Sequence, residues 1–131
     1  LADALIGQFS LLESRDAPGR KVNGALTGGE NIGDLGGLTI GYSAYRIALG
    51  DQPAPELDGF TGEQRFFLGW AQVWRGKARA AEAERLLAID PHSPMDLRAN
   101  AVRNLAEFHE AFGTAPADGM WLPDDERVRI F

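Results

Sequence analysis

The sequence predicts a mainly α-helical domain with long ordered loops between its helices. Apolar residues recur every three or four positions in several segments, which places them on one face of a helix. No long stretch alternates apolar and polar residues as a half-buried strand would. Prolines and glycines gather between the periodic segments, where they favour turns. At 131 residues, the chain is expected to form a single domain, 1–131.

Two helices are expected in the first half of the chain. Residues 1–14 carry apolar residues at helical spacing, and residues 15–29, which are rich in glycine, are expected to form a loop. A second helix is expected over residues 30–49. The apolar stripe of the first is Leu1, Leu5, Phe9 and Leu12, and that of the second is Leu35, Leu38, Tyr42, Tyr45 and Leu49.

A third helix is expected after the proline-rich loop 50–60. Thr61 and Gln64 have the spacing of a capping box, in which each side chain bonds the other residue's backbone N–H. This helix is expected to run to about Arg79, and a shorter helix is expected over residues 81–88.

The last part of the chain is expected to be less regular. Residues 89–103 contain two prolines and are expected to form an ordered loop. Asn104 and Glu107 repeat the capping spacing, which predicts a final helix from Asn104 to about Phe112. The tail, 117–131, is expected to be mostly irregular.

Composition limits the classes of partner. The net charge of −6 argues against a nucleic-acid backbone or an anionic membrane as the main partner. The absence of cysteine excludes disulfides and thiolate zinc sites. No apolar run reaches the roughly 18 residues of a membrane span. The chain begins with Leu1 and has no signal pattern, so a processed product or a piece of a longer protein is expected, and its compartment is unknown.

Two acidic residues in the segment TGGENIGDLGG, 27–37, need an explanation. Glu30 and Asp34 lie four positions apart, on one face of a helix, where like charges cost a few tenths of a kcal/mol. Gly33 between them costs up to about 1 kcal/mol relative to alanine. One interpretation is a capping box made by Thr27 and Glu30. The other is a metal site in which one carboxylate binds the ion and the other orients a metal-bound histidine.

The sequence does not contain a complete zinc site. Its two histidines, His92 and His109, do not form the i, i+4 pair of zinc-binding helices. His109 is assigned no role. A phosphate-binding loop is excluded because no Lys-Ser or Lys-Thr follows the glycines.

Several stretches together resemble the neprilysin-type (neprilysin/PepO-like) zinc metallopeptidases. The segment 22–46 is similar to the family's Glu-Asn-x-x-Asp-x-Gly-Gly region. Three further segments follow in the family's order: FFLGWAQVWRGKAR at 66–79, DPHSPMDLR at 90–98, and 108–131, which ends in an aromatic residue, Phe131.

The resemblance implies roles for five residues around one zinc ion. Glu30 matches the third zinc ligand, and Asp34 matches the aspartate that orients a zinc-bound histidine. His92 matches the histidine that donates a hydrogen bond to the oxyanion. Arg98 matches the arginine that binds a substrate carbonyl, and Asp90 matches an acid that helps to position it.

The resemblance also implies substrate contacts and a missing part. Val73 and Trp74 match residues beside the hydrophobic pocket on the primed side of the substrate. The family's His-Glu-x-x-His helix is absent, because only 29 residues precede Glu30 and none is histidine. The chain thus resembles the helical C-terminal portion of a zincin-like catalytic domain.

Such a portion is expected to be inactive alone, with zinc absent or weakly bound. Its implied partners are peptide substrates and the missing N-terminal part of the same protein. Apolar surface left uncovered would favour self-association. The lack of cysteine indicates a bacterial-type relative, because the animal members use disulfides.

Two alternatives stay open. In the first, the chain is a non-catalytic helical interaction module related to these peptidases. In the second, a metal site is built from Glu30, Asp34, His92 and a partner chain. A His-Glu-x-x-His helix in the upstream coding region would favour the peptidase.

Overall fold

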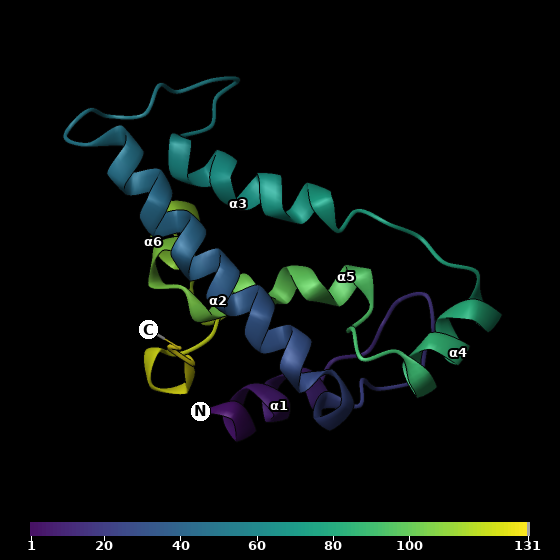
Figure 1. Cartoon of the computed structure of the whole chain (residues 1–131). Helices are drawn as coiled ribbons and strands as arrows, with labels where there is room; N and C mark the ends of the chain where they lie inside the picture. The colour runs from purple at the N-terminus through teal and green to yellow at the C-terminus, as the bar shows by residue number, and fades with distance from the viewer. Residues whose placement is uncertain (131) are drawn as a thin grey trace.

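The computed structural model describes residues 1–130 and is built from helices joined by loops, which confirms the predicted class (Figure 1). Phe131, the expected aromatic end, lies outside the described residues. Within 1–130 the extended pairings are two isolated bridges, Glu13 with Lys21 and Leu57 with Phe60. The helices are α1 (Ala2–Ser10), α2 (Gly24–Leu49), α3 (Gly62–Val73), α4 (Ala80–Ile89), α5 (Met95–Arg98) and α6 (Ala106–Phe112), with short 3-10 helices at Ala99–Asn104 and Asp124–Glu126.

The long helix α2 crosses the molecule, and α1 and the 3-10 helix Ala99–Asn104 pack directly against it (Figure 1). α1 lies against its N-terminal end, and the 3-10 helix that follows α5 lies against its middle. α3 and α6 pack against each other near its C-terminal half. One core cluster joins these elements, and it includes Leu5, Phe9, Leu35, Leu38, Phe67, Leu97, Val102 and Phe108. No helix in the described part of the chain has both the length and the apolar character to cross a bilayer.

α2 begins six residues earlier than the sequence predicted. The N-cap is Asn23, whose side chain accepts a hydrogen bond of 3.1 Å from the Leu26 backbone N–H. The interpretation of Thr27 and Glu30 as a capping box is therefore wrong, because both lie inside the helix. A Cβ at Gly24 would overlap the Ile6 carbonyl oxygen and the Ser10 Oγ, so this glycine lets α2 begin directly against α1.

α3 begins where it was predicted and ends six residues early. The capping box is confirmed, because Thr61 Oγ1 accepts from the Gln64 N–H and Gln64 Oε1 accepts from the Thr61 N–H. The helix ends at Val73 instead of Arg79.

Contacts with a distant loop explain this early end. The Arg15 side chain donates to the Gly76 carbonyl oxygen at 3.3 Å, and Asp16 accepts from the Ala78 N–H at 2.8 Å. These bonds occupy backbone groups that a longer α3 would use within the helix. The expected helix at 81–88 is present as α4, with slightly wider bounds.

Two expectations for the C-terminal half were wrong. The predicted loop 89–103 contains α5, which starts directly after Pro94, and most of the 3-10 helix that follows it from Ala99. Asn104 does not cap the last helix, because its side chain is buried and bonds Gln8 and the Val128 N–H. The N-cap of α6 is Leu105, which makes no side-chain cap.

The first helix also ends earlier than expected, at Ser10.

The close approach at Gly24 predicts a stability difference between two glycines of α2. Gly24→Ala should lower the free energy of unfolding by about 1–3 kcal/mol, because the added methyl group overpacks the contact with α1. Gly29→Ala is the matched control, since a Cβ there meets nothing within 4 Å. It should raise stability by up to about 1 kcal/mol. Urea unfolding of both variants measures the difference, and equal effects would contradict the assignment.

Candidate functional site

Glu30 and Asp34 lie one turn apart on α2 but in different environments. Both border the buried stripe of the helix, which includes Asn31 and Leu35. The Glu30 side chain is 48% exposed, whereas that of Asp34 is 9% exposed. One carboxylate is therefore accessible to a ligand, and the other is held within the protein.

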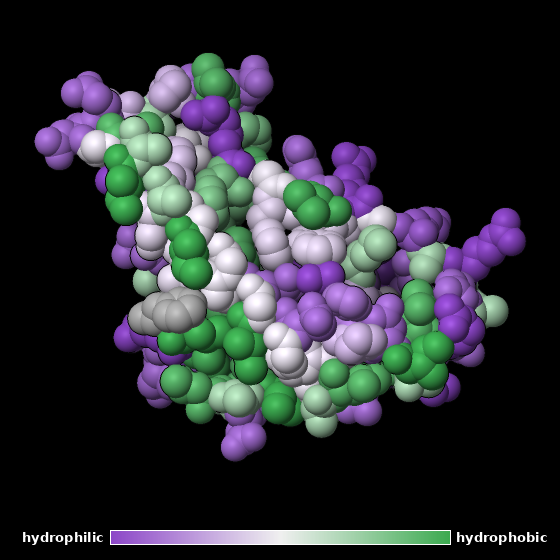
Figure 2. Space-filling model, viewed as in Figure 1, coloured by the Kyte–Doolittle hydropathy of each residue, from purple (hydrophilic) through white to green (hydrophobic). Residues whose placement is uncertain are grey.

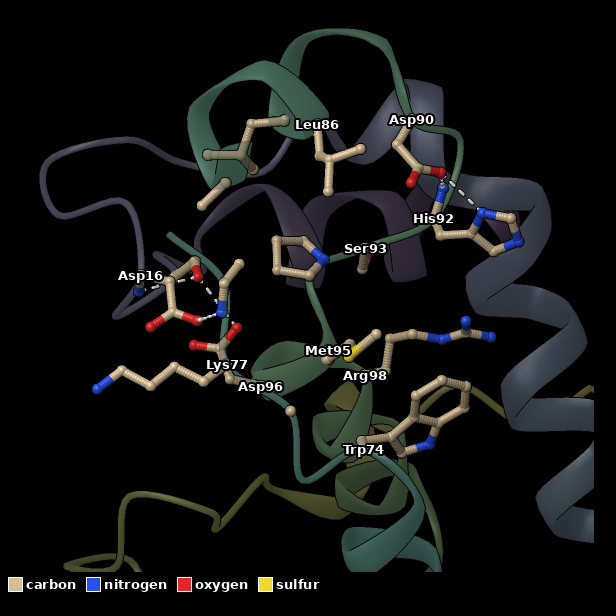
Figure 3. Close-up of a pocket in the computed structure, with 16 residues that line it drawn as sticks. Asp16, Trp74, Lys77, Leu86, Asp90, His92, Ser93, Met95, Asp96 and Arg98 are labelled. Carbon is tan, nitrogen blue, oxygen red and sulfur yellow. Dashed lines mark hydrogen bonds and ion pairs between the residues drawn. The ribbon is translucent and has the colours of Figure 1, made fainter. Parts of the chain in front are cut away.

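Asp34 is paired with Arg98 of α5. Arg98 Nε lies 2.7 Å from Asp34 Oδ2, and Nη2 lies 2.5 Å from Oδ1, which is a two-bond contact. The guanidinium carbon lies 3.8 Å from the ring centroid of Trp74, a cation–π contact at the end of α3. Figure 3 shows the Arg98 side chain extending above the indole ring. Arg98 thus connects α2, α3 and α5.

His92 stands between two carboxylates. Its Nδ1 lies 2.7 Å from Asp90 Oδ1, and its backbone N–H donates to the same oxygen at 2.9 Å (Figure 3). These hydrogen bonds, that of the backbone N–H first and that of the ring second, hold the pKa of Asp90 below its usual value. Because a carboxylate only accepts, the Nδ1 of His92 carries a hydrogen. Its Nε2 is then the nitrogen presented to Glu30, whose Oε2 lies 3.3 Å away.

The structure brings together most of the residues that the resemblance implied. Glu30, Asp34, His92 and Arg98 meet where the segment 90–98 approaches α2. The contacts of Asp90 differ from the expectation, because it bonds His92, and the carboxylate bound to Arg98 is Asp34. Val73 lies at the end of α3 with 69% of its surface exposed, beside Trp74.

A cavity of about 330 Å³ borders the site, between α4, the segment 76–78 and the segment 90–98 (Figure 3). Its lining is mostly apolar, with Leu86 from α4 and Met95 from α5. Trp74, His92 and Arg98 also line it.

Two buried polar residues were missed by sequence reasoning. Asn31 is fully buried and Ser93 is 3% exposed, and the Ser93 hydroxyl donates to Asn31 Oδ1 at 2.8 Å. The available signal was their position, because each directly follows a candidate site residue, Glu30 or His92.

His109 is a structural residue away from the site. It is buried, its Nε2 lies 2.8 Å from the Arg103 carbonyl oxygen, and its Nδ1 lies 2.5 Å from Thr114 Oγ1. Both ring nitrogens are occupied in joining α6 to its flanking segments.

The described residues offer a zinc ion an incomplete set of ligands. Residues 1–130 contain no group of three His, Cys, Asp or Glu side chains arranged to hold a metal. Catalytic zinc sites use three protein ligands, most often histidine and carboxylate. The accessible Glu30 fits one of these positions. Space for another element lies beside it, because Cβ atoms at Gly29 and Gly33 would meet nothing within 4 Å.

The buried pair of Asp34 and Arg98 predicts a stability effect. Asp34→Ala should lower the free energy of unfolding by about 3 kcal/mol, because it leaves Arg98, 14% exposed, without its counter-charge. Glu63→Ala is the control, because it breaks the exposed pair of Glu63 with Arg46 and should cost at most about 1 kcal/mol. Denaturant unfolding measures both, and similar losses would show that the Asp34 pair contributes no more than a surface pair.

Comparisons of the sequence agree with the resemblance. Residues 2–128 match the family described as "Peptidase family M13". Neprilysin-1 of Caenorhabditis elegans is 46% identical over 98 residues, which cover 70% of this chain and 13% of that protein. Membrane metallo-endopeptidase-like 1 of Homo sapiens is 38% identical and is matched over 99% of this chain and 17% of its own length. The chain therefore spans less than a fifth of the length of these relatives.

Solved structures give the same result. The zinc metalloprotease ZMP1 of Mycobacterium tuberculosis in its open state superposes with a TM-score of 0.95 and 52% identity, over 99% of this chain and 21% of that one. PepO from Lactobacillus rhamnosis gives 0.79 and 35%, over 98% of this chain and 19% of that one. The chain belongs to peptidase family M13, the neprilysin-type metallopeptidases.

Proposed function

We propose that the full-length protein is a zinc-dependent endopeptidase to which this chain contributes one zinc ligand and two groups that bind the scissile peptide unit. Glu30 is the proposed ligand, and His92 and Arg98 are the proposed binding groups. Membership of family M13, whose members are zinc metalloendopeptidases, supports the reaction class. The observation that carries the proposal is the meeting of Glu30 with His92 at 3.3 Å, directly beside the fixed Arg98.

His92 and Arg98 have the chemistry to bind the scissile peptide unit. Glu30 and two ligands from the rest of the protein would hold the zinc ion, which would supply Lewis acidity toward the scissile carbonyl and the attacking water. His92, held at Nδ1 by Asp90, directs Nε2 toward the side of Glu30, and when both ring nitrogens carry hydrogens the Nε2–H can donate there to the developing oxyanion. Arg98 uses two N–H groups on Asp34, and its remaining N–H groups can bind a substrate carbonyl.

Trp74 and Val73 are proposed to bind a substrate side chain next to this peptide unit. Trp74 already contacts Arg98, so a side chain placed against it lies beside the bound carbonyl. Val73 contributes an exposed apolar surface one residue earlier.

The proposed partner of the open face of α2 is the remaining part of the same protein. The glycines Gly29, Gly33 and Gly37 leave space beside Glu30, and Ile40 and Ile47 are 59% and 81% exposed on the same helix. Figure 2 shows hydrophobic side chains gathered in several patches on this view of the molecule. An element carrying two histidines could approach here and complete the metal site. Without it, this surface favours self-association of the chain.

The isolated chain should bind zinc weakly and cleave no peptide. One carboxylate and His92 cannot supply the three ligands of a catalytic site. Isothermal titration calorimetry of the monomeric chain with zinc should show no submicromolar affinity. Tight binding by a monomer would instead support a self-contained site.

Two variants of the full-length protein test the proposed roles. His92→Phe should lower kcat more than a hundredfold with KM nearly unchanged, because a donor to the oxyanion is worth about 3 kcal/mol in the transition state alone. Arg98→Ala should also weaken binding of a peptide inhibitor, because it contacts the substrate before and during the reaction.

Zinc content separates these roles from metal binding. It should stay unchanged in both variants and should fall in Glu30→Gln, measured by mass spectrometry of the purified protein. Loss of zinc from His92→Phe would show that His92 is itself a ligand and would overturn the assignment.

A further inference from the structure

We infer that Asn31 and Ser93 form a positioning pair that fixes His92 relative to Glu30, an inference that rests on the proposed function. Each residue directly follows one of the two proposed active groups in the chain. The hydrogen bond between them, 2.8 Å long and buried, lies behind the exposed contact of Glu30 with His92.

The bond is part of a buried chain that reaches the start of α2. Ser93 Oγ donates to Asn31 Oδ1, and Asn31 Nδ2 donates to Thr27 Oγ1 at 3.0 Å. Thr27 Oγ1 donates in turn to the Asn23 carbonyl oxygen at 3.3 Å, four residues earlier. The 90–98 segment is thereby fastened to the helix body that carries Glu30.

The direction of this chain is determined by its last acceptor. The Asn23 carbonyl oxygen can only accept, so the Thr27 hydroxyl hydrogen points toward it. Thr27 Oγ1 must then accept from Asn31, which places the amide nitrogen on that side and the amide oxygen toward Ser93. All three donors point the same way, an arrangement in which each bond strengthens the next.

The exposed contact cannot fix the loop by itself. The side chains of Glu30 and His92 are 48% and 46% exposed, and ion pairs of this kind contribute little to holding a geometry. The buried amide and hydroxyl are different, because leaving either without a partner away from water is unfavourable. The loop is therefore held at Ser93, one residue from the group that must be placed.

This arrangement has a consequence for the reaction. A donor to the oxyanion acts only within a narrow range of distance, and a displacement of about 1 Å can cost about a hundredfold in rate. Removing the Ser93 hydroxyl should release the backbone next to His92 while leaving Glu30, Asp34 and Arg98 in place.

The test compares three variants of the full-length, zinc-loaded protein. Ser93→Ala removes one hydroxyl, and Asn31→Leu removes both bonds of the amide. Asn104→Leu is the matched control, because Asn104 is equally buried and bonds Gln8 and the Val128 N–H far from the site. For each variant we would measure kcat, KM, zinc content, melting temperature and affinity for a peptide phosphinate, whose tetrahedral oxygens stand for the oxyanion.

Ser93→Ala and Asn31→Leu should lower kcat by about 10- to 100-fold and weaken phosphinate binding by a similar factor. KM and zinc content should change little. Asn104→Leu should lower the melting temperature yet keep the kcat and phosphinate affinity of the wild type.

Two results would overturn the inference, and they differ. If the wild type is active and both site variants keep its kcat and phosphinate affinity per zinc-loaded molecule, Asn31 and Ser93 serve stability alone. If the wild type cleaves no peptide, the proposed function fails and the inference with it. Should Asn31→Leu fail to fold, Ser93→Ala, the smaller change, decides.

Discussion

The two-bond contact between Asp34 and Arg98 is the interaction on which the site depends. It joins residues 64 positions apart in the chain, and both side chains are nearly buried. Two charges in such a place are stable only as a pair, so the contact requires α5 to lie against α2. His92 and Ser93, which lie just before α5, are brought to α2 by the same constraint, and Trp74 closes over the guanidinium from α3.

The glycines of α2 differ in what a side chain at each position would contact. Packing within this chain requires a glycine at Gly24, because a side chain there would collide with α1. No contact within residues 1–130 requires glycine at Gly29 or Gly33, because a Cβ at either position would meet nothing within 4 Å. Each of these glycines destabilises the helix by up to about 1 kcal/mol relative to alanine, and favourable packing must offset that loss. At Gly29 and Gly33 that packing is proposed to come from the rest of the protein.

Helix periodicity was enough to predict the fold class and most of the helices, but not their ends. The early start of α2 follows from the cap at Asn23 and the contact of Gly24 with α1, which is a tertiary feature. The early end of α3 follows from bonds made by Arg15 and Asp16, some 60 residues away in sequence. In the site, the spacing of Glu30 and Asp34 gave a chemical signal, whereas the signal from Asn31 was only its position directly after Glu30. A buried helix position is expected to be apolar, and its polar partner, Ser93, lies 62 residues away.

Burial separates the side chains that hold the site in position from those that are proposed to bind zinc or substrate. Asp34, Asn31 and Ser93 are largely or fully buried, and each has its partner within this chain. Arg98 belongs to both groups, because it is bound to Asp34 and is also proposed to bind the substrate. Glu30 and His92 are about half exposed. An exposed carboxylate such as Glu30 keeps its hydration, so it carries no large desolvation penalty while the open face of α2 is uncovered. Once another element covers that face, the same carboxylate loses water and needs a counter-charge. In the proposed full-length enzyme a zinc ion at Glu30 would supply that counter-charge, so covering this face and binding the metal would favour each other.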